Sequence, residues 1–377
     1  MSSPVARVLW ICGAGHLGGA ERVSLTLLDA LRRRGQAIEA VTRVGSPVTA
    51  AAQALEVPVH AVHLRGPARI LGVLPLRRLL ATRAADVALV TTVDEWVTAC
   101  LALPCRAGPH LVLVRHMGLP LSAGVRTLAG RRARAVIAVS EAVRRALLAA
   151  PGIPPSRVHV IPNPVRFPVR TAVPGACLRS ATRATLGLHA PGYWVGFFGG
   201  DAPAKGLHDV LAAVGAANRS VGPTNLLVGS PQPGGALVMP AHLRDRVHRL
   251  TDPERMADAL TAVDLVVGAT HRSLGEALPA TLMEAMALGT PVVAYATGGV
   301  PEVLGTDGGS GQLVASDDVT ALAAAVGALL ADPARRDQLA AAALQRARTQ
   351  FDPEVAAAAY AALWGDFRIV DRRSDPV

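Results

Sequence analysis

Apolar positions along the first part of the chain follow two alternating patterns. Short apolar runs, such as those at 5–12 and 110–115, are typical of buried parallel strands. Between such runs, apolar residues return every third or fourth position, as in 20–34, which predicts amphipathic helices. The repeated strand and helix unit predicts a parallel, doubly wound sheet. The expected strands are 5–12, 38–42, 57–64, 87–91, 110–115, 135–140 and 158–161, and the expected helices are 20–34, 69–82, one from residue 95, and 141–149.

A second series of the same kind follows a stretch of weak periodicity. Residues 166–191 are rich in Pro, Arg and Ala, which favours a linker carrying at most one short helix, at 179–187. The chain is therefore expected to form a first domain at 1–168, a linker at 169–190, a second domain at 191–350 and a final helix within 351–377. The further expected strands are 193–198, 224–228, 265–268 and 291–296. The further expected helices are 206–217, 257–262, 279–288, one from residue 301, 319–331, 333–350 and 353–368.

Length and composition agree with two domains and exclude several classes. A chain of 377 residues is too long for one ordinary core, and its 51% hydrophobic content is ample for two. The net charge is +10, and of 38 basic residues only Lys205 is a lysine. The 3% aromatic content argues against a nucleic-acid partner, because single-stranded bases stack on aromatic side chains. No cysteine spacing fits a zinc site or a disulfide framework.

No apolar segment is long enough to span a membrane, and the apolar start runs directly into a glycine loop. These features predict a cytoplasmic protein. Residues 69–83 alternate apolar residues with arginines, as an interfacial helix does. A peripheral contact at the inner face of a membrane is therefore an alternative location. A solvated helix in an arginine-rich chain explains the same pattern at least as well.

Two carboxylates and a glycine turn mark the most informative stretch of the sequence. Glu276 lies in a loop, Glu284 lies on the helix that follows, and Gly298-Gly299 comes after the next strand. In open α/β sheets such loops meet at the carboxyl ends of the strands, where ligands bind. Carboxylates accept hydrogen bonds from the hydroxyl groups of sugars and ribose, and a glycine turn permits close backbone approach. On spacing alone, solvated surface carboxylates explain the pattern equally well.

The whole stretch resembles the signature of the retaining glycosyltransferases of family 4. The match comprises Glu276, seven intervening residues and Glu284, then Ala-Met-Ala-x-Gly-Thr-Pro-Val-Val-Ala, then Gly-Gly-Val-Pro-Glu-Val. The resemblance implies the GT-B fold, in which two Rossmann-like domains face an interdomain cleft. It also implies that Glu276 contacts the transferred sugar and Glu284 the ribose. Ala277 and Leu278 replace the family's usual Gly-Phe, whose backbone contacts the donor sugar.

Lys205 follows a strand and precedes a helix, in Gly-Gly-Asp-Ala-Pro-Ala-Lys-Gly. A cation at this place can hold an anion that the helix N-terminus already favours. The resemblance implies that Lys205 binds the donor diphosphate together with an arginine five positions earlier. This chain has Gly200 at that position, so one of the two expected cations is missing.

The glycine loop near the start of the chain supports two interpretations. Gly13-x-Gly15-x-x-Gly18, with Glu39 about 20 residues on, fits a dinucleotide-binding fingerprint and thus an NAD-dependent oxidoreductase. The longer string Gly-Gly-Ala-Glu-Arg at 18–22 resembles the family 4 opening instead. That resemblance places Gly18 and Gly19 against the donor, and His16 and Glu21 on the acceptor side.

Two further residues, His116 and Asn163, follow from the resemblance. His116, at the end of a strand, corresponds to a histidine beside the transferred sugar, although a structural role is equally compatible with its position. Asn163, in Ile-Pro-Asn, is interpreted as a hinge residue. His60 and His63 lack further ligands nearby in sequence and are interpreted as non-metal residues.

The sequence therefore predicts a retaining hexosyltransferase that takes its sugar from a nucleotide-diphosphate donor. The acceptor class is a glycolipid, a polysaccharide precursor or a small metabolite. No Asp-x-Asp motif is present, which favours catalysis without a metal or another cofactor. Three alternatives stay open: the NAD-dependent oxidoreductase, a sugar-nucleotide binder without activity, and a sugar epimerase of the same fold.

Overall fold

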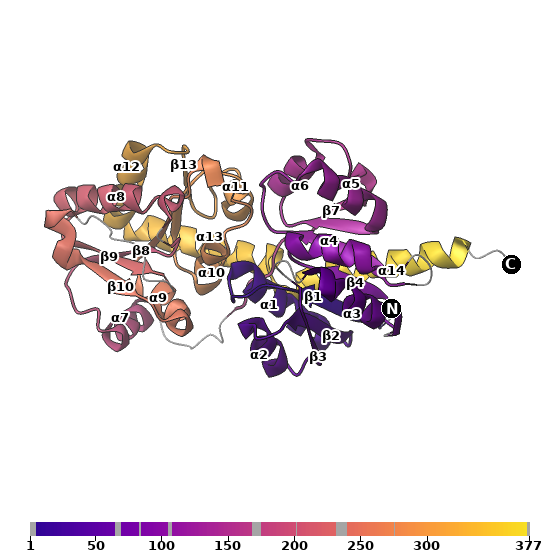
Figure 1. Cartoon of the computed structure of the whole chain (residues 1–377). Helices are drawn as coiled ribbons and strands as arrows, with labels where there is room; N and C mark the ends of the chain where they lie inside the picture. The colour runs from indigo at the N-terminus through magenta and orange to yellow at the C-terminus, as the bar shows by residue number, and fades with distance from the viewer. Residues whose placement is uncertain are drawn as a thin grey trace. The chain divides into compact units, whose positions relative to one another are not determined.

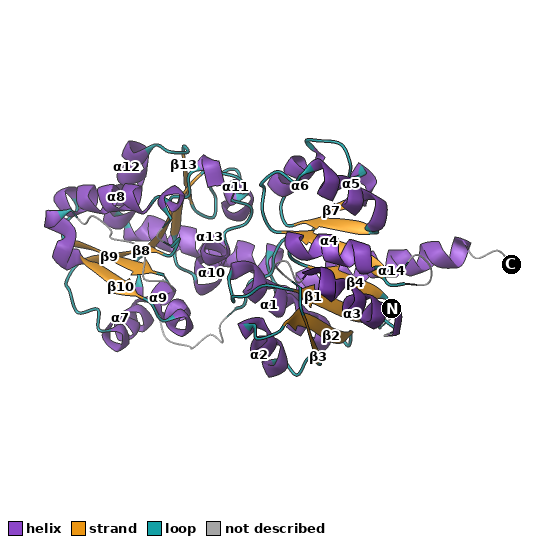
Figure 2. Ribbon diagram, viewed as in Figure 1, coloured by secondary structure: helices purple, strands orange, loops and turns teal. Residues whose placement is uncertain are grey.

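The computed structural model describes residues 5–64, 69–82, 84–104, 108–167, 175–200, 202–230, 240–274 and 276–374. The chain divides into two compact units, which are traced by colour in Figure 1. Unit 1 comprises Met1–Pro164 together with Phe351–Val377, and unit 2 comprises Val165–Gln350. In each unit, helices lie on both sides of a parallel sheet (Figure 2). The predicted class, two Rossmann-like parallel-sheet domains, is confirmed.

Unit 1 contains a seven-stranded sheet in the order β3-β2-β1-β4-β5-β6-β7. The order reverses between β1 and β4, which creates the kind of crevice where α/β sheets bind ligands. The strands are β1 (Arg7–Cys12), β2 (Ala37–Arg43), β3 (Val59–Val62), β4 (Val87–Val90), β5 (His110–Arg115), β6 (Ala135–Ala138) and β7 (Val158–Val160). The helices are α1 (Gly19–Arg33), α2 (Pro47–Ala54), α3 (Arg69–Thr82), α4 (Val93–Ala102), α5 (Ala123–Arg132), α6 (Glu141–Leu148) and α14 (Pro353–Ser374), with the 3-10 turn η1 (Pro155–Arg157).

The final helix belongs to unit 1, although it lies at the far end of the sequence. Helix α14 packs against α1. The guanidinium Nη1 of Arg34 lies 3.5 Å from Oε2 of Glu354, across this contact. Tyr360 and Trp364 on α14 are buried, with 3% and 2% of their surfaces exposed, so the helix contributes to the core of the unit.

Unit 2 contains a six-stranded sheet in the order β10-β9-β8-β11-β12-β13, which reverses between β8 and β11. The strands are β8 (Tyr193–Phe197), β9 (Thr224–Gly229), β10 (Val247–Leu250), β11 (Leu265–Gly268), β12 (Val292–Tyr295) and β13 (Gln312–Val314). The helices are α7 (Gly175–Leu186), α8 (Leu207–Ser220), α9 (Met256–Ala262), α10 (Ala280–Leu288), α11 (Val300–Leu304), α12 (Val319–Ala331) and α13 (Pro333–Gln350), with the 3-10 turns η2 (Pro203–Lys205), η3 (Ala241–Arg246), η4 (Pro253–Arg255) and η5 (Arg272–Leu274).

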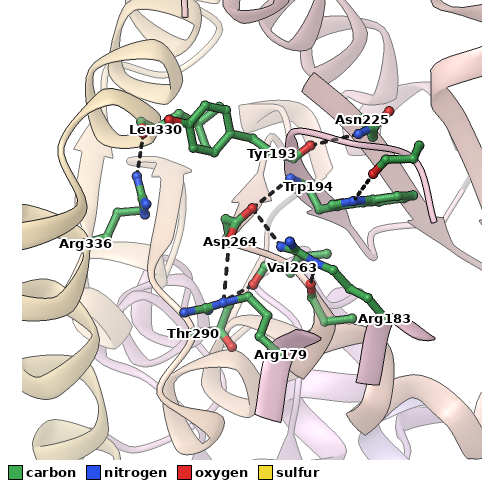
Figure 3. A network of polar contacts seen from close by, with 12 residues as sticks. Arg179, Arg183, Tyr193, Trp194, Asn225, Val263, Asp264, Thr290, Leu330 and Arg336 are labelled. Carbon is green, nitrogen blue, oxygen red and sulfur yellow. Dashed lines mark hydrogen bonds and ion pairs between the residues drawn. The ribbon is translucent and has the colours of Figure 1, made fainter. Parts of the chain in front are cut away.

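Helix α7 lies within the stretch expected to be a linker, and it is fixed to the sheet of unit 2. Arg183 Nη2 and Arg179 Nε lie 2.7 Å and 3.5 Å from the Asp264 carboxylate (Figure 3). The same carboxylate accepts a hydrogen bond of 2.9 Å from the backbone N–H of Trp194, at the start of β8. Asp264 therefore joins α7, β8 and the segment before β11. Residues 169–174 of the expected linker lie outside the described residues.

Four elements were not predicted from the sequence. Strands β10 and β13 are short and lie at the two edges of the sheet of unit 2, where fewer apolar residues are needed. Helix α2 is capped by the side chain of Ser46, and α5 by that of Ser122. Both helices bury few residues, so their apolar periodicity is weak.

Candidate active site

The loop after β8 presents Lys205 beside the N-terminus of α8. Lys205 ends the turn η2, and Gly206, in the left-handed conformation with φ +78°, begins the helix. A Cβ atom on Gly206 would lie 2.1 Å from the carbonyl oxygen of Ala269, in the loop after β11. Glycine is thus required both for the backbone angle and for the close approach of the two loops. These loops follow the two strands at which the strand order reverses.

Lys205 and Glu276 are brought into direct contact. The ammonium Nζ of Lys205 lies 2.6 Å from Oε2 of Glu276, and the hydroxyl of Thr270 donates a 3.2 Å hydrogen bond to the same oxygen. The two charged side chains are 26% and 16% exposed, so the pair is accessible from solvent but partly shielded. The site therefore combines one cation and one carboxylate at the end of the sheet.

The glycine turn after β12 holds the backbone of Glu276. Gly298 has φ +53°, and a Cβ atom there would lie 1.8 Å from the carbonyl oxygen of Glu276. Gly299 donates its backbone N–H to that oxygen at 3.1 Å. The Thr297 hydroxyl donates to the carbonyl of Thr270 at 3.1 Å. The expected close backbone approach is confirmed, and the partner is the chain's own loop.

The other predicted site residues of unit 2 lie close to Lys205 or to Glu276 in the sequence. Ala277 and Leu278 are buried, at 3% and 8% exposure, so their side chains point into the protein. Glu284 is half-buried on α10, which is followed by Gly289 in the left-handed conformation. Gly200 has φ +80°, and a Cβ atom there would have open space around it.

Sequence reasoning missed a second carboxylate in these loops, Asp209 on α8. Its Oδ2 atom accepts a 2.8 Å hydrogen bond from the Tyr295 hydroxyl and lies 3.0 Å from Nε2 of His271. His271 follows Thr270 directly, and Tyr295 ends β12. The position of His271 five residues before Glu276 was the only sequence signal for this cluster.

In unit 1, the first glycines of the Gly13–Gly19 loop are packed against the chain itself. A Cβ atom on Gly13 would lie 2.1 Å from Oε1 of the buried Glu95. A Cβ atom on Gly15 would lie 2.8 Å from Nη1 of Arg43, which ends β2. Any side chain at these two positions would therefore displace a charged group of the protein.

The second half of the loop forms the N-terminus of α1. The Glu21 carboxylate, 6% exposed, accepts a 3.0 Å hydrogen bond from the backbone N–H of Gly18, as in a helix capping box. His16 lies beside Gly18, with its Nε2 3.3 Å from the position of an added Cβ atom. Gly19 is the first residue of the helix. Glu21 thus has a structural role here, and a contact of Glu21 with an acceptor stays a prediction.

The acid required by the dinucleotide interpretation is in the wrong part of its strand. Glu39 is the third residue of β2, opposite Leu9 in the sheet, whereas a ribose-binding acid lies at the carboxyl end of the strand. Its Oε2 atom lies 2.7 Å from Nε2 of His60 on the neighbouring strand. Glu39 therefore gives no support to an NAD-binding site.

His116 directly follows β5, and both of its ring nitrogens are buried. Neither nitrogen has a hydrogen-bond partner of good geometry among the described residues. Burial, followed by the charge of Arg115, lowers the pKa of His116 to about 4, while the side chain of Asn163 acts in the opposite direction. His116 is therefore a neutral imidazole at physiological pH. Asn163, interpreted above as a hinge residue, lies next to this histidine.

Across 5–374, apart from the gaps given above, no three His, Cys, Asp or Glu side chains are grouped as metal ligands would be. Within the same ranges, no helix has both the length and the apolar character that crossing a bilayer requires.

Both halves of the chain match family models of glycosyltransferases. Residues 17–167 match the family model described as Glycosyltransferase Family 4, and residues 192–332 match Glycosyl transferases group 1. The α-maltose-1-phosphate synthase of Mycobacterium tuberculosis is 31% identical over 309 residues, which cover 72% of this chain and 78% of that protein. The D-inositol 3-phosphate glycosyltransferase of Kineococcus radiotolerans is 31% identical over 236 residues, 56% of this chain. That match spans only about half of the relative, 53% of its length.

Solved structures show the same fold at low sequence identity. HepE of Anabaena, crystallised with UDP and glucose, superposes with a TM-score of 0.79 at 22% identity, over 96% of this chain and 100% of HepE. Sucrose-phosphate synthase of Thermosynechococcus elongatus gives a TM-score of 0.75 at 21% identity, over 97% and 100% of the two chains.

Proposed function

Because this chain belongs to glycosyltransferase family 4, we propose that it transfers a hexosyl group from a nucleotide-diphosphate sugar to an acceptor hydroxyl, with retention of anomeric configuration and without a metal. One observation carries the proposal. The chain's only lysine, Lys205, lies beside a helix N-terminus and 2.6 Å from Glu276, in the loops at the reversal point of the sheet. A cation there suits a diphosphate, and the adjacent carboxylate suits sugar hydroxyl groups.

Each residue of this site has a proposed task. Lys205 binds the diphosphate and stabilises the negative charge that grows on it as the C1–oxygen bond breaks. Glu276 accepts hydrogen bonds from hydroxyl groups of the transferred sugar, and Glu284 accepts them from the ribose. The buried side chains of Ala277 and Leu278 leave their backbone N–H groups as the parts able to contact a donor.

Group transfer then needs no further protein acid or base. The C1–oxygen bond to the diphosphate breaks, and the acceptor oxygen forms the new bond to C1 on the face that the leaving group vacates. The proton of the acceptor hydroxyl passes to an oxygen of the departing diphosphate. Lys205 favours the breaking of the C1–oxygen bond, because it stabilises the diphosphate more strongly as its charge increases.

Two regions of unit 1 are proposed to lie beside the substrates. His116 is neutral at physiological pH, and the family resemblance places it beside the transferred sugar. Its ring nitrogens are buried in this structure, so the side chain must be uncovered before it can hydrogen-bond a sugar hydroxyl. The loop around Gly18 and Gly19, with His16, is proposed to lie beside substrate.

The first test is a screen for the donor and its product. Thermal stabilisation is measured with UDP-, GDP- and dTDP-sugars, and the best donor is then incubated with an acceptor panel that includes D-inositol 3-phosphate. We expect one nucleotide class to stabilise the protein and NMR to show a product with the anomeric configuration of the donor. Stabilisation without any transfer or hydrolysis supports a sugar-nucleotide binder without activity. Gly200 favours this alternative, because it replaces one of the two cations expected to bind the diphosphate. Donor conversion without acceptor supports an epimerase. Quenching of the protein's tryptophan fluorescence by NADH supports a dehydrogenase.

A peripheral contact with an anionic membrane is part of the proposal. Leu71 and Leu74 on α3 are 71% and 66% exposed, and the exposed Arg77 and Arg78 follow in the next turn. Apolar side chains flanked by cations suit the surface of a bilayer with negative lipids. Arg83, the last residue of the predicted interfacial helix, lies outside the described residues.

Sedimentation with vesicles tests this contact. We expect more binding to vesicles of phosphatidylcholine and phosphatidylglycerol than to phosphatidylcholine alone, and loss of binding in a Leu71→Ser, Leu74→Ser variant. Val355→Ser, at a 47% exposed apolar position on α14, is the matched control and should bind as the wild type does. Equal sedimentation of the double variant and the wild type contradicts the proposal.

A further inference from the structure

A single carboxylate connects the three loops that form the candidate donor site. Asp209 lies in the first turn of α8, four residues after Lys205. Its Oδ2 atom accepts from the Tyr295 hydroxyl at 2.8 Å and lies 3.0 Å from Nε2 of His271. The Asp209 side chain is only 15% exposed. These contacts link the loops after β8, β11 and β12.

Each partner of Asp209 is adjacent to a residue that holds the Lys205–Glu276 pair. His271 follows Thr270, whose hydroxyl binds the Glu276 carboxylate. The backbone N–H of His271 also donates a 2.8 Å hydrogen bond to the carbonyl of Ala204, the residue before Lys205. Tyr295 lies two residues before Thr297, whose hydroxyl holds the Thr270 carbonyl. A change at Asp209 would therefore reach Lys205 and Glu276 through the backbone.

The side chains of Asp209, His271 and Tyr295 are chemically suited to keep their contacts with one another. Burial raises the pKa of Tyr295, and its hydrogen bond to Asp209 raises it further, so the phenol stays a donor across the whole working range of pH. His271 Nδ1 lies 4.0 Å from Oδ1 of Asp317, so the imidazole lies between two carboxylates from different segments. Asp209 lies at a helix N-terminus, where a negative charge is favoured.

We propose that Asp209, His271 and Tyr295 are positioning residues, which hold Lys205 and Glu276 at the separation that binding a diphosphate requires. This inference rests on the proposed function of the Lys205 site. None of the three needs to touch the donor, because they act through the loops that they join. Displacement of a catalytic group by about 1 Å can lower a rate by about a hundredfold, so such residues affect turnover without direct contact.

The test uses inorganic pyrophosphate as a probe, because it is independent of the nucleotide base. Calorimetry measures its Kd for the wild type and for Lys205→Ala, Asp209→Asn, Tyr295→Phe and His271→Ala, and kcat and KM are measured with the donor found by the screen. We expect Asp209→Asn and His271→Ala to weaken pyrophosphate binding about tenfold and to lower kcat by a similar factor. Tyr295→Phe, which removes one oxygen atom, should weaken binding less. His271→Gln should bind pyrophosphate more tightly than His271→Ala does, because the glutamine amide nitrogen can still reach Asp209. His208→Ala, at the exposed residue next to Asp209, is the matched control and should equal the wild type.

The outcomes separate this inference from the proposed function. If Lys205→Ala binds pyrophosphate as tightly as the wild type does, the diphosphate site itself is wrong. If Lys205→Ala loses binding while folded Asp209→Asn and His271→Ala keep wild-type Kd and kcat, the positioning role is overturned. Circular dichroism identifies folded variants. If Asp209→Asn fails to fold, Tyr295→Phe and His271→Ala decide the question, and wild-type values for both would overturn the inference.

Discussion

The ammonium group of Lys205 lies 2.6 Å from the carboxylate of Glu276, across 71 positions of sequence. Each charge is thereby compensated within the site. Under the proposed function, we expect a diphosphate that binds Lys205 to take the place of Glu276 as its partner. The carboxylate would then be released to accept hydrogen bonds from sugar hydroxyl groups.

Lys205→Ala should lower kcat by about two orders of magnitude or more, because charge on the departing diphosphate is then no longer stabilised. Steady-state transfer or donor hydrolysis measures the effect. Arg219→Ala removes an exposed cation from the far end of α8 and should leave kcat unchanged. A Lys205→Ala enzyme with near-normal turnover would remove this residue from the mechanism.

Gly200→Arg should tighten pyrophosphate binding by about tenfold, because a guanidinium forms charge-assisted hydrogen bonds to phosphate oxygens. Space is available at this position, but the backbone angle of +80° disfavours any side chain and should cost about 1 kcal/mol of unfolding free energy. Gly187→Arg is a close control, with φ +72° and open space at the end of α7. Both variants should lose similar stability, and only Gly200→Arg should bind more tightly. Equal affinities for the two variants would contradict the expected second cation site.

Gly298→Ala should both destabilise unit 2 and lower activity. The added Cβ atom would lie 1.8 Å from the Glu276 carbonyl oxygen, so the turn and the loop that carries the carboxylate must separate. Gly289→Ala tests backbone strain alone, because its φ is +72° and its surroundings are open. We expect Gly289→Ala to cost about 1 kcal/mol and to keep wild-type kcat. Urea denaturation and donor turnover measure the two effects, and a Gly298→Ala enzyme indistinguishable from Gly289→Ala would show that the contact is unimportant.

His116 should make the stability of unit 1 depend on pH. Burial and the charge of Arg115 lower its pKa from 6.5 to about 4. Between these values, the unfolded chain binds a proton that the folded unit does not bind. Stability therefore falls as the pH falls from 6.5 to about 4, and this residue has no effect above that range. Over this pH range, His116 should lower the free energy of unfolding of unit 1 by about 3 kcal/mol.

Urea unfolding at pH values within and above this window measures the loss. In a Trp194→Phe background, the remaining tryptophans, Trp10, Trp96 and Trp364, all belong to unit 1, so their fluorescence follows that unit alone. His116→Asn should lose less stability on acidification than the wild type. His63→Asn, at an exposed histidine of the same unit, should behave as the wild type does. The same acid sensitivity in His116→Asn and the wild type would assign the effect to other groups.

Sequence periodicity was sufficient for most of the fold. Helices at 69–82 and 319–331 and the strand at 110–115 were predicted with the bounds that the structure has. The edge strand β13 has three residues and was missed, since so short a run carries no period. Helix α2 could have been found from Ser46-Pro47, a cap followed by a proline in the first turn.

The candidate site could be predicted only in part. Lys205 and Glu276 were identified separately, but their contact depends on β8 and β11 being neighbours in the sheet, which local sequence does not encode. The Asp209 cluster was missed for the same reason, because its members are 62 and 86 residues apart. Glu21 shows the opposite case: three positions after Gly18, it could have been interpreted from the start as a helix cap.

The chain's single lysine has a practical consequence for labelling. Apart from the terminal amine, an amine-selective reagent can modify only one side chain, and that side chain is 26% exposed beside Glu276. Reductive methylation with ¹³C-formaldehyde would therefore introduce one side-chain NMR probe, at Lys205. Its chemical shift would follow occupancy of the site directly, and any ligand that covers the ammonium group would slow the labelling reaction.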